Sequence, residues 1–371
     1  MRKIWIGKRE SDIQTYPYFD YSITFWGSNN DTNFSFCEKK RINSDYSPAF
    51  THFVIKKLKE LIDDSSDEYQ IFFYNNSFAY KIIDLDTSLR PLVKNLNSVY
   101  IHNLLRHKTL SRLWLSNSVD VPAFASLSKH ECKYEHLKIM FSGYERFVIQ
   151  ENYSGGGEGT YIISSQNADK VLKKLSDNKT FLISPYYENN ISLSCTLMID
   201  DYSSLIFPVS QQILIFNDHI RYCGNHYYKN GENISACVKS NAKKVGETLR
   251  NIGYRGICGL DWIYTNKKIL LIEVNPRFQG SSFAINEALK RKGLPSLFEL
   301  NNNCFTNGIP TKIKECITKL SIPFENHSIF LDQMPIKNEP DELIYLDGYD
   351  KSETFEDNVY LYRYISFPKE T

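Results

Sequence analysis

The sequence has no long apolar run, no excess of either charge and no closely spaced cysteine pair. Its 371 residues include 44 Lys and Arg against 43 Asp and Glu, a formal net charge of +1. This balance produces no basic field of the kind that attracts nucleic acid or an anionic membrane. No apolar segment has bilayer-spanning length, and the apolar stretch after Met1 is too short for a secretory signal. We therefore expect no nucleic-acid partner, no membrane partner and a cytoplasmic location.

The cysteines and histidines also lack the spacing that disulfide frameworks and zinc sites require. None of the eight cysteines forms a C-x-x-C pair, and most lie within apolar segments. In a chain of this length they favour free buried thiols over a disulfide framework. His102 and His107 are five residues apart, which does not place them on one helical face. We therefore expect no zinc site.

The most informative feature present is a pair of apolar strands with acidic residues, within residues 259–282. A polar turn at 265–268 joins the strands. Asp261 lies on the first strand. Glu273 and Asn275 lie on the second, two residues apart and therefore on the same face. A hairpin folded at this turn places Asp261 opposite Glu273. Carboxylate and amide oxygens suit Mg²⁺, so these three residues are candidate metal ligands.

Each of these residues also has a structural interpretation. Asp261 alone fits a solvated strand position, and Glu273 alone fits an ion pair with Lys267 or Lys268. Carboxylates inside apolar runs are costly unless they are paired or bind a metal, and here two occur near the same register. This coincidence favours the metal interpretation. Arg277 follows the second strand, and its planar guanidinium suits a phosphate or a carboxylate.

A glycine-rich hairpin lies upstream of the acidic strands. The strand 147–150 is followed by a tip and a return strand that contain Gly155, Gly156, Gly157, Gly159 and Thr160. Glycine lets backbone N–H groups approach an anion without an intervening side chain. No Gly-Lys-Ser/Thr follows, which excludes a Walker A loop, and a strand rather than a helix follows, which excludes a dinucleotide fingerprint. A phosphate-covering flap and a flexible surface hairpin are both compatible with this segment.

Taken together and in this order, the two hairpins resemble those of the ATP-grasp superfamily of carboxylate–amine ligases. The resemblance covers residues 100–300 and implies an α/β protein, with an open α/β domain preceding the ATP-grasp fold. It implies ATP and Mg²⁺, or Mn²⁺, as cofactors, with the glycine-rich hairpin as the flap. Lys108 lies where the family has a nucleotide-binding lysine before a helix. Glu273, Asn275 and Arg277 correspond to catalytic positions.

One position departs from the family pattern. Many members have a lysine in the strand before the flap, where this chain has Gln150. An amide can hydrogen-bond to phosphate but brings no charge. Either another cation compensates, with Lys108 and Arg277 as candidates, or the correspondence is shifted by a residue or two.

The resemblance assigns further residues to the nucleotide. The strand 181–185 runs into the linker where the family binds adenine. A later strand contributes Gln211 as a further polar candidate for contact with the nucleotide or the substrate. The residues concerned are Ser184, Pro185, Tyr186, Tyr187, Glu188 and Gln211. Backbone groups from Ser184 onward would read the base edge, and Glu188 would reach the ribose. For each tyrosine, ordinary core packing is an equally open interpretation.

Hydrophobic periodicity predicts an open α/β sheet in the first hundred residues. Strands are expected at 4–6, 21–26 and 69–74, and a helix is expected from Pro48. Lys8 and Arg9 follow the first strand, where such sheets bind ligands, although a solvated loop explains them equally well. Later elements are expected as strands at 193–199, 204–212 and 214–216 and helices at 168–175, 242–252 and 281–290.

We expect four parts in the chain. These are an N-terminal α/β domain at 1–103, a flap subdomain at 104–187, a metal-binding subdomain at 188–330 and a C-terminal extension packed on the core at 331–371. The chemistry expected is an ATP-dependent ligation of a carboxylate to an amine, or a similar nucleophile, through an acyl phosphate, with release of ADP and phosphate.

The expected partners are a small carboxylic acid and an amine, amino-acid or peptide-like, and a homodimer is compatible with the family. An ATP-dependent kinase on the same scaffold and a nucleotide-binding module without turnover are the alternatives. A stable phosphorylated product would distinguish the kinase. The intact set of carboxylates argues against the binding module.

Overall fold

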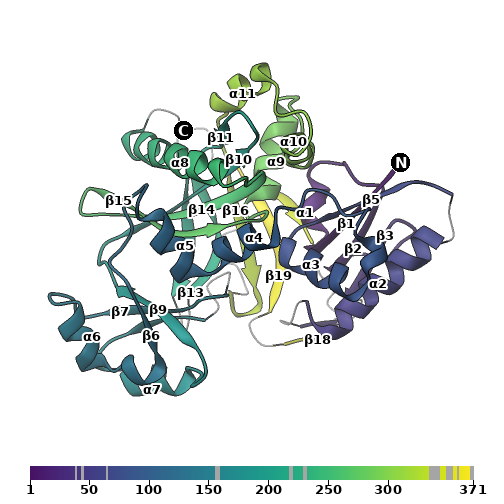
Figure 1. Ribbon diagram of the computed structural model, residues 1–371. Helices are drawn as coiled ribbons and strands as arrows, with labels where there is room; N and C mark the ends of the chain where they lie inside the picture. The colour runs from purple at the N-terminus through teal and green to yellow at the C-terminus, as the bar shows by residue number, and fades with distance from the viewer. Residues whose placement is uncertain are drawn as a thin grey trace.

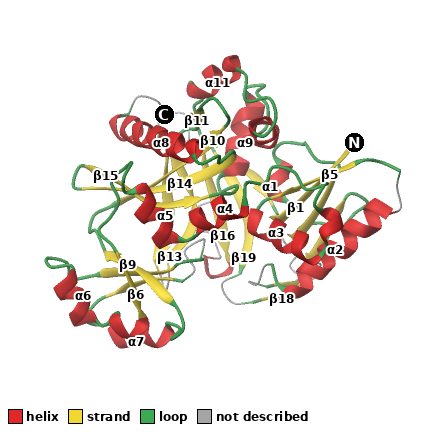
Figure 2. Ribbon diagram, in the orientation of Figure 1, coloured by secondary structure: helices red, strands yellow, loops and turns green. Residues whose placement is uncertain are grey.

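The structure is a computed structural model with three larger sheets and helices packed on them (Figure 1, Figure 2). It describes residues 1–37, 40–42, 46–63, 66–154, 159–216, 220–228, 232–333, 343–347, 354–356 and 359–367. Across these residues, no helix is both long enough and apolar enough to cross a membrane. The α/β class predicted from the sequence is confirmed.

The N-terminal sheet is entirely parallel, with strand order β3-β2-β1-β5. Its strands are β1 Arg2–Arg9, β2 Tyr21–Trp26, β3 Asn33–Cys37 and β5 Tyr69–Phe73. Helix α2, Pro48–Asp63, has proline at its first position and buries Phe50 and Val54, one turn apart. Because the carboxyl ends of parallel strands share one edge, Arg9 at the end of β1 and Tyr74 directly after β5 lie at the same end of the sheet.

The predicted strands and the predicted helix of this region are confirmed. The sequence analysis did not anticipate β3 or the short helices α1 Ser11–Gln14, α3 Asn76–Leu85 and the 3-10 turn Thr87–Leu89. Asn75 caps α3 by accepting a hydrogen bond from the Ser77 N–H at 2.9 Å. This cap lies directly after β5 and fixes where the chain leaves the sheet.

The flap sheet is antiparallel, with strand order β6-β9-β7-β8. Its strands are β6 Ala125–Ser128, β7 Phe147–Glu151, β8 Thr160–Ile163 and β9 Thr180–Pro185, and its helices are α6 Tyr134–Met140 and α7 Ala168–Lys174. A 3-10 turn at Lys129–Glu131 follows β6. Phe147, Ile149 and Phe181 form its buried core with α6 and α7. The two strands predicted on either side of the glycine-rich segment are confirmed as β7 and β8.

The central sheet has nine strands in the order β15-β14-β10-β12-β13-β16-β19-β17, with β11 paired to β10. Its strands are β10 Ile191–Ile199, β11 Ser204–Ile206, β12 Ser210–Phe216, β13 Ile220–Tyr227, β14 Gly256–Thr265, β15 Lys268–Asn275, β16 Glu325–Phe330, β17 Leu343–Leu346 and β19 Tyr360–Ser366. Successive side chains of β10 point to opposite faces of the sheet, which differ in polarity. Leu193 and Leu197 enter the apolar core beneath α8, while Ser194 faces a cleft. This alternation gives the sheet one apolar face and one polar face at the site.

Helices cover this sheet and join it to the N-terminal one. They are α4 Val99–Arg106, α5 Lys108–Leu115, α8 Asn233–Asn251, α9 Ser282–Arg291, α10 Leu297–Cys304 and α11 Thr311–Thr318. Trp5 of β1 packs edge-on against Phe298 of α10, with ring centroids 5.1 Å apart. The N-terminal sheet therefore packs α2 and α3 on one face and the α9–α10 pair on the other.

Two expectations in this region were wrong in extent. The helix expected at 242–252 begins nine residues earlier, because Ser235 and Val238 also bury one face of α8. The strand expected at 204–212 is two strands, interrupted where Pro208 cannot donate to the ladder. The second of these, β12, runs through to Phe216 and pairs with the unanticipated β13.

The last strands of the chain are integral to the central sheet. β16 and β19 pair over their length, although they lie on either side of the boundary expected near residue 330. A 3-10 turn at Leu331–Gln333 follows β16, and the two-residue strands β4 Lys40–Arg41 and β18 Thr354–Phe355 also pair. Tyr360 and Tyr362 of β19 enter the core of the N-terminal sheet, so the end of the chain ties the two sheets together.

Candidate active site

The β14–β15 hairpin holds the acidic residues in the predicted register. Asn266 and Lys267 form its turn with φ of 48° and 62°, the left-handed pair typical of a type I′ turn. Asp261 pairs directly with Glu273 across the two strands, which confirms the register predicted from the sequence. Counted from the turn alone, Asp261 would face Ile272, and a shift of register directly after Asp261 brings Glu273 opposite it.

Asp261 is half-buried and surrounded by polar groups. Its carboxylate oxygens accept hydrogen bonds from Gln212 Nε2 at 3.0 Å and from Asn275 Nδ2 at 2.8 Å. Burial and the negative charge of Glu273 raise the pKa of Asp261 to about 7. Two facing carboxylates in a setting that disfavours their charge form an arrangement that a cation stabilises.

Lys108 supplies a positive charge to this pair. Its Nζ lies 2.9 Å from Glu273 Oε2 and donates to the Ser154 carbonyl at 2.6 Å, and the side chain is only 3% exposed. Lys108 begins α5, whose next residue, Thr109, donates to the Asn152 side chain through both its N–H and its hydroxyl. Helix α5, the base of the flap and the acidic strand therefore meet at Lys108.

The residues present fit a divalent cation. Asp261 and Glu273 offer hard carboxylate oxygens on neighbouring strands, and Asn275 offers an amide oxygen beside them. That amide oxygen accepts a hydrogen bond from Arg277 Nη2 at 3.1 Å. Among the described residues no group of three His, Cys, Asp or Glu side chains is arranged to hold a metal. Such an ion would therefore depend on the amide and on oxygens from a bound substrate.

A polar layer beneath the acidic residues requires glycine at position 259. Gln279 accepts a hydrogen bond from Thr196 Oγ1 at 2.9 Å and donates to Ser194 Oγ at 3.2 Å. A Cβ at Gly259 would lie 2.0 Å from the Gln279 side chain. The absence of a side chain there lets Gln279 lie flat against β14.

The flap sheet forms a second wall of the same cleft. Its lining residues that the sequence also singled out are Gln150, Gly159, Thr160, Ser184, Pro185, Tyr186 and Tyr187. Gly159 has φ of +63°, and a Cβ there would lie 2.9 Å from Glu151. Both the backbone conformation and the close approach therefore favour glycine. Gly155, Gly156 and Gly157 lie outside the described residues.

Of the residues assigned to the nucleotide from the sequence, Glu188 and Gln211 do not line the cleft. Glu188 is exposed and forms a two-point ion pair with Arg146. Gln211 is exposed on the opposite face of β12. Its neighbour Gln212 faces the cleft and reaches Asp261, since successive strand residues point to opposite sides.

Arg112 is a cation that the sequence analysis missed. It lies on α5, one turn after Lys108, and lines the cleft although it is only 2% exposed. Its Nη2 donates to the Ile272 carbonyl at 2.8 Å and lies 3.5 Å from Gln150 Oε1, while Nε and Nη1 have no hydrogen-bond partner. Burial lowers the pKa of Arg112 to about 10, against the opposing charge of Glu273. The i, i+4 spacing of Lys108 and Arg112 on one helix was the available signal.

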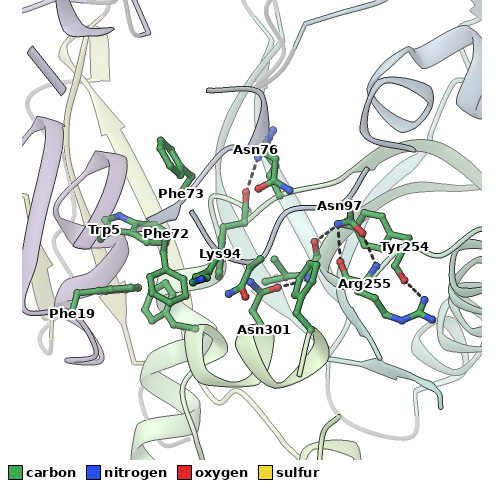
Figure 3. Close-up of a pocket in the computed structure, with 16 residues that line it drawn as sticks. Trp5, Phe19, Phe72, Phe73, Asn76, Lys94, Asn97, Tyr254, Arg255 and Asn301 are labelled. Atoms are coloured by element: carbon green, nitrogen blue, oxygen red, sulfur yellow. Dashed lines mark hydrogen bonds between the residues drawn. The ribbon is translucent and has the colours of Figure 1, made fainter. Parts of the chain in front are cut away.

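The cleft encloses about 910 Å³ and is lined by all three larger sheets. A second cavity behind Arg277 holds about 20 Å³, which is room for a water molecule and not for a substrate. Figure 3 shows its polar side, where Asn97 exchanges two hydrogen bonds with the backbone of Arg255, at 2.8 and 2.7 Å. This contact fixes the segment that leads into α4 to the residue that precedes β14.

Residues 106–281 match a family model described as an ATP-grasp domain. This segment of the chain is similar to ATP-grasp domains. Its fold agrees with that of carboxyaminoimidazole ribonucleotide synthase from Aspergillus clavatus in complex with ATP, with a TM-score of 0.66 and 12% identity over 99% of this chain and 94% of that one. The N5-carboxyaminoimidazole synthetase from Staphylococcus aureus complexed with ADP gives 0.63 and 15% over 100% and 94%. The ATP-grasp fold expected from the sequence is thus confirmed.

A curated relative is similar over a shorter stretch. A [butirosin acyl-carrier protein]–L-glutamate ligase from Niallia circulans is 25% identical over 167 residues, which are 43% of this chain. The match spans 39% of that relative's length. This chain therefore shares part of its sequence with a ligase whose full length it does not cover.

Proposed function

We propose that this chain is an ATP-dependent ligase that joins a carboxylate to an amine or a similar nucleophile. The observation that carries the proposal is the convergence, in one cleft, of the Asp261–Glu273 pair, Lys108 and Arg277. The relatives support it, since one is named as a ligase of L-glutamate and an acyl-carrier protein, and solved neighbours of the same fold hold ATP or ADP.

The reaction proposed has two steps. A carboxylate oxygen of the acid attacks the γ-phosphorus of ATP, the bond from phosphorus to the bridging oxygen breaks, and ADP leaves. The amine nitrogen then attacks the carbonyl carbon of the acyl phosphate, phosphate leaves with the bonding electrons, and the nitrogen loses a proton. The protein contributes position and charge neutralisation to both steps.

The cleft residues divide these tasks. Asp261, Glu273 and Asn275 would hold Mg²⁺ or Mn²⁺, which when bound neutralises phosphate oxygens. Lys108 and Arg277 would donate to the transferred phosphoryl group.

The flap sheet would cover the nucleotide. Gln150 and Thr160 would hydrogen-bond its phosphates together with backbone N–H groups at Gly155, Gly156, Gly157 and Gly159. Backbone groups from Ser184 to Tyr187 would meet the base edge. Closure over the acyl phosphate would exclude water, which otherwise hydrolyses it.

Product analysis tests this function. The protein is incubated with ATP, Mg²⁺ and a panel of acids, with hydroxylamine as the nucleophile. We expect ADP, phosphate and an acyl hydroxamate, each dependent on the acid. A stable phosphorylated acid without hydroxamate would show a kinase, and ATP binding without turnover across acids and amines would show a binding module.

A further inference from the structure

The cleft carries more positive charge than the ligation chemistry requires. Its acidic lining residues within the described part of the chain are Asp261 and Glu273, which the proposed metal site uses. Apart from Lys108 and Arg112 of α5 and Lys174 of α7, four basic side chains of the described residues line it, namely Lys8, Arg9, Arg221 and Arg277. Arg221 is neutralised by Asp332, with both carboxylate oxygens within 2.8 Å of Nη1. If Arg277 serves the phosphoryl group, Lys8 and Arg9 are lining cations that the ligation chemistry does not use.

Lys8 and Arg9 lie where a parallel sheet presents its ligand-binding edge. They end β1, and the neighbouring strand β5 ends beside them with Tyr74 and Asn75, which line the same cleft. Asn75 is the N-cap of the ten-residue helix α3, so the positive end of the helix dipole also lies at this edge. Three sources of positive potential thus share one edge of the N-terminal sheet.

Arg9 is held in place by aromatic rings and keeps donor capacity. Its guanidinium lies 4.1 Å from the centre of the Tyr360 ring and 5.7 Å from that of Trp26, and Lys8 Nζ lies 4.9 Å from the same Trp26 ring. Arg9 Nε is buried and has no hydrogen-bond partner. Contacts with aromatic rings hold the Arg9 guanidinium in place and leave its N–H groups available as donors. A buried donor without an acceptor costs free energy unless a ligand accepts its hydrogen bond.

Tyr74 connects this edge with Arg277. Burial raises the pKa of the Tyr74 hydroxyl, and the positive charges of Arg277 and Arg9 both oppose that rise. The Tyr74 hydroxyl therefore interacts electrostatically with both guanidinium groups. The Tyr74 ring also packs against Phe278, the residue after Arg277, with centroids 6.3 Å apart. A small molecule at Tyr74 is thus within the field of Arg277 on one side and of Arg9 on the other.

We propose that the acid substrate carries a second anionic group, a carboxylate or a phosphate, which Lys8 and Arg9 bind while its reactive carboxylate faces Arg277. This inference rests on the proposed ligase function and names the substrate class for it. Dicarboxylic acids and phosphorylated acids share the chemistry that this edge recognises. The second anion anchors the acid and leaves the reactive carboxylate free to attack ATP.

Binding and turnover are measured separately to test this. Calorimetry on protein saturated with ADP and Mg²⁺ compares succinate, glutarate and adipate with their monoamides, and phosphoglycolate with glycolate. We expect at least one anionic acid to bind about tenfold more tightly than its neutral partner. The comparison of dicarboxylates with monoamides tests for a second carboxylate, and the comparison of phosphoglycolate with glycolate tests for a phosphate. Wild-type protein that binds every acid and its partner equally, or binds none of them, overturns the proposal.

Variants then assign the effect to the edge. Arg9→Gln and Lys8→Gln should each reduce the preference for the anionic partner about fivefold or more, with ATP affinity unchanged within about twofold. Lys3→Gln on the same strand, outside the cleft, is the matched control and should keep the preference. A preference that survives Arg9→Gln and Lys8→Gln equally contradicts the proposal.

Because hydroxylamine is the nucleophile in every reaction, any difference in turnover between two acids comes from the acid. Hydroxamate formation that fails for every acid, while calorimetry still shows the preference, would count against the ligase function and leave the anion site standing. Hydroxamate formed equally well from an acid and its monoamide would keep the ligase and reject the site.

Discussion

At the residue scale, the charge of Glu273 serves two partners. In the structure it neutralises the buried Lys108, and in the proposed reaction it holds a metal ion. Glu273→Gln keeps the size of the side chain and removes the charge. We expect turnover to fall by about a hundredfold or more, because the metal loses a hard anionic ligand. Hydroxamate formation at saturating ATP measures this.

The same substitution should also change stability. Lys108 would retain the Ser154 carbonyl but lose its carboxylate, so the metal-free protein should lose about 1–3 kcal/mol of unfolding free energy. Glu247→Gln on the exposed face of α8 is the control and should change neither quantity. Wild-type turnover in Glu273→Gln would remove the basis of the proposed metal site.

Arg112 changes what is expected at Gln150. From the sequence alone, Gln150→Lys would supply a missing charge and be tolerated. The structure places Gln150 Oε1 3.5 Å from the buried Arg112 guanidinium, so a lysine there would meet a like charge with little solvent to screen it. We expect Gln150→Lys to lose stability and to weaken ATP binding.

A double-mutant cycle tests whether Arg112 carries the charge that Gln150 lacks. Arg112→Leu alone should weaken ATP binding, and Gln150→Lys combined with Arg112→Leu should recover part of the loss, giving a coupling of about 1–2 kcal/mol. ATP titration of the four proteins measures it. Additive losses would show that the two positions do not share one task.

At the scale of elements, features that depend on local sequence pattern could be predicted. Features that depend on packing between segments far apart in the chain could not. The β14–β15 hairpin, its turn and the shared face of Glu273 and Asn275 followed from local pattern, whereas the register shift that sets Glu273 opposite Asp261 did not. Gln211 and Gln212 are adjacent polar residues, and only the pairing of β12 with β10 and β13 shows which one faces the cleft. Arg112 looked like an ordinary helix cation because its burial depends on β7 and β15, which lie far along the chain.

The β7–β8 hairpin offers a test of the flap at this scale. Gly159 combines φ of +63° with a close approach to Glu151, whereas Gly143 has φ of +88° with nothing near its Cβ position. Gly143→Ala thus reports the backbone cost alone, about 1 kcal/mol. Gly159→Ala should cost more than that and should raise the KM for ATP.

Thermal unfolding and ATP kinetics on both glycine variants separate the two effects. If Gly159→Ala behaves like Gly143→Ala in stability and leaves the KM for ATP unchanged, the β7–β8 hairpin has no role in phosphate binding.

At the scale of the whole molecule, a buried charge network joins the N-terminal sheet to the central one. Arg363 on β19 is fully buried, forms an ion pair with Asp12 of α1 and donates to Ser11 Oγ at 2.6 Å. Asp347 receives the Ser11 N–H at 2.8 Å. Burial opposes the charge of Arg363, but Asp12 and neighbouring anions outweigh it and raise the pKa of the guanidinium. Residues from both ends of the chain thus hold the edge with Lys8 and Arg9 beside Arg277.

Arg363→Met should therefore act on the acid site and spare the nucleotide site. It leaves Asp12 and Asp347 buried without their cation, and we expect a loss of about 3–5 kcal/mol in unfolding free energy. Adding Asp12→Asn and Asp347→Asn should restore a large part of it, because no uncompensated charge remains. In both proteins the KM for the acid should rise several-fold, since α1 begins two residues after Arg9 and the edge loses its anchor. ATP affinity should stay within about twofold, because the flap sheet and the β14–β15 hairpin do not contact this network. Equal losses for acid and ATP would show that the two sheets are coupled through the whole cleft and not through Arg363.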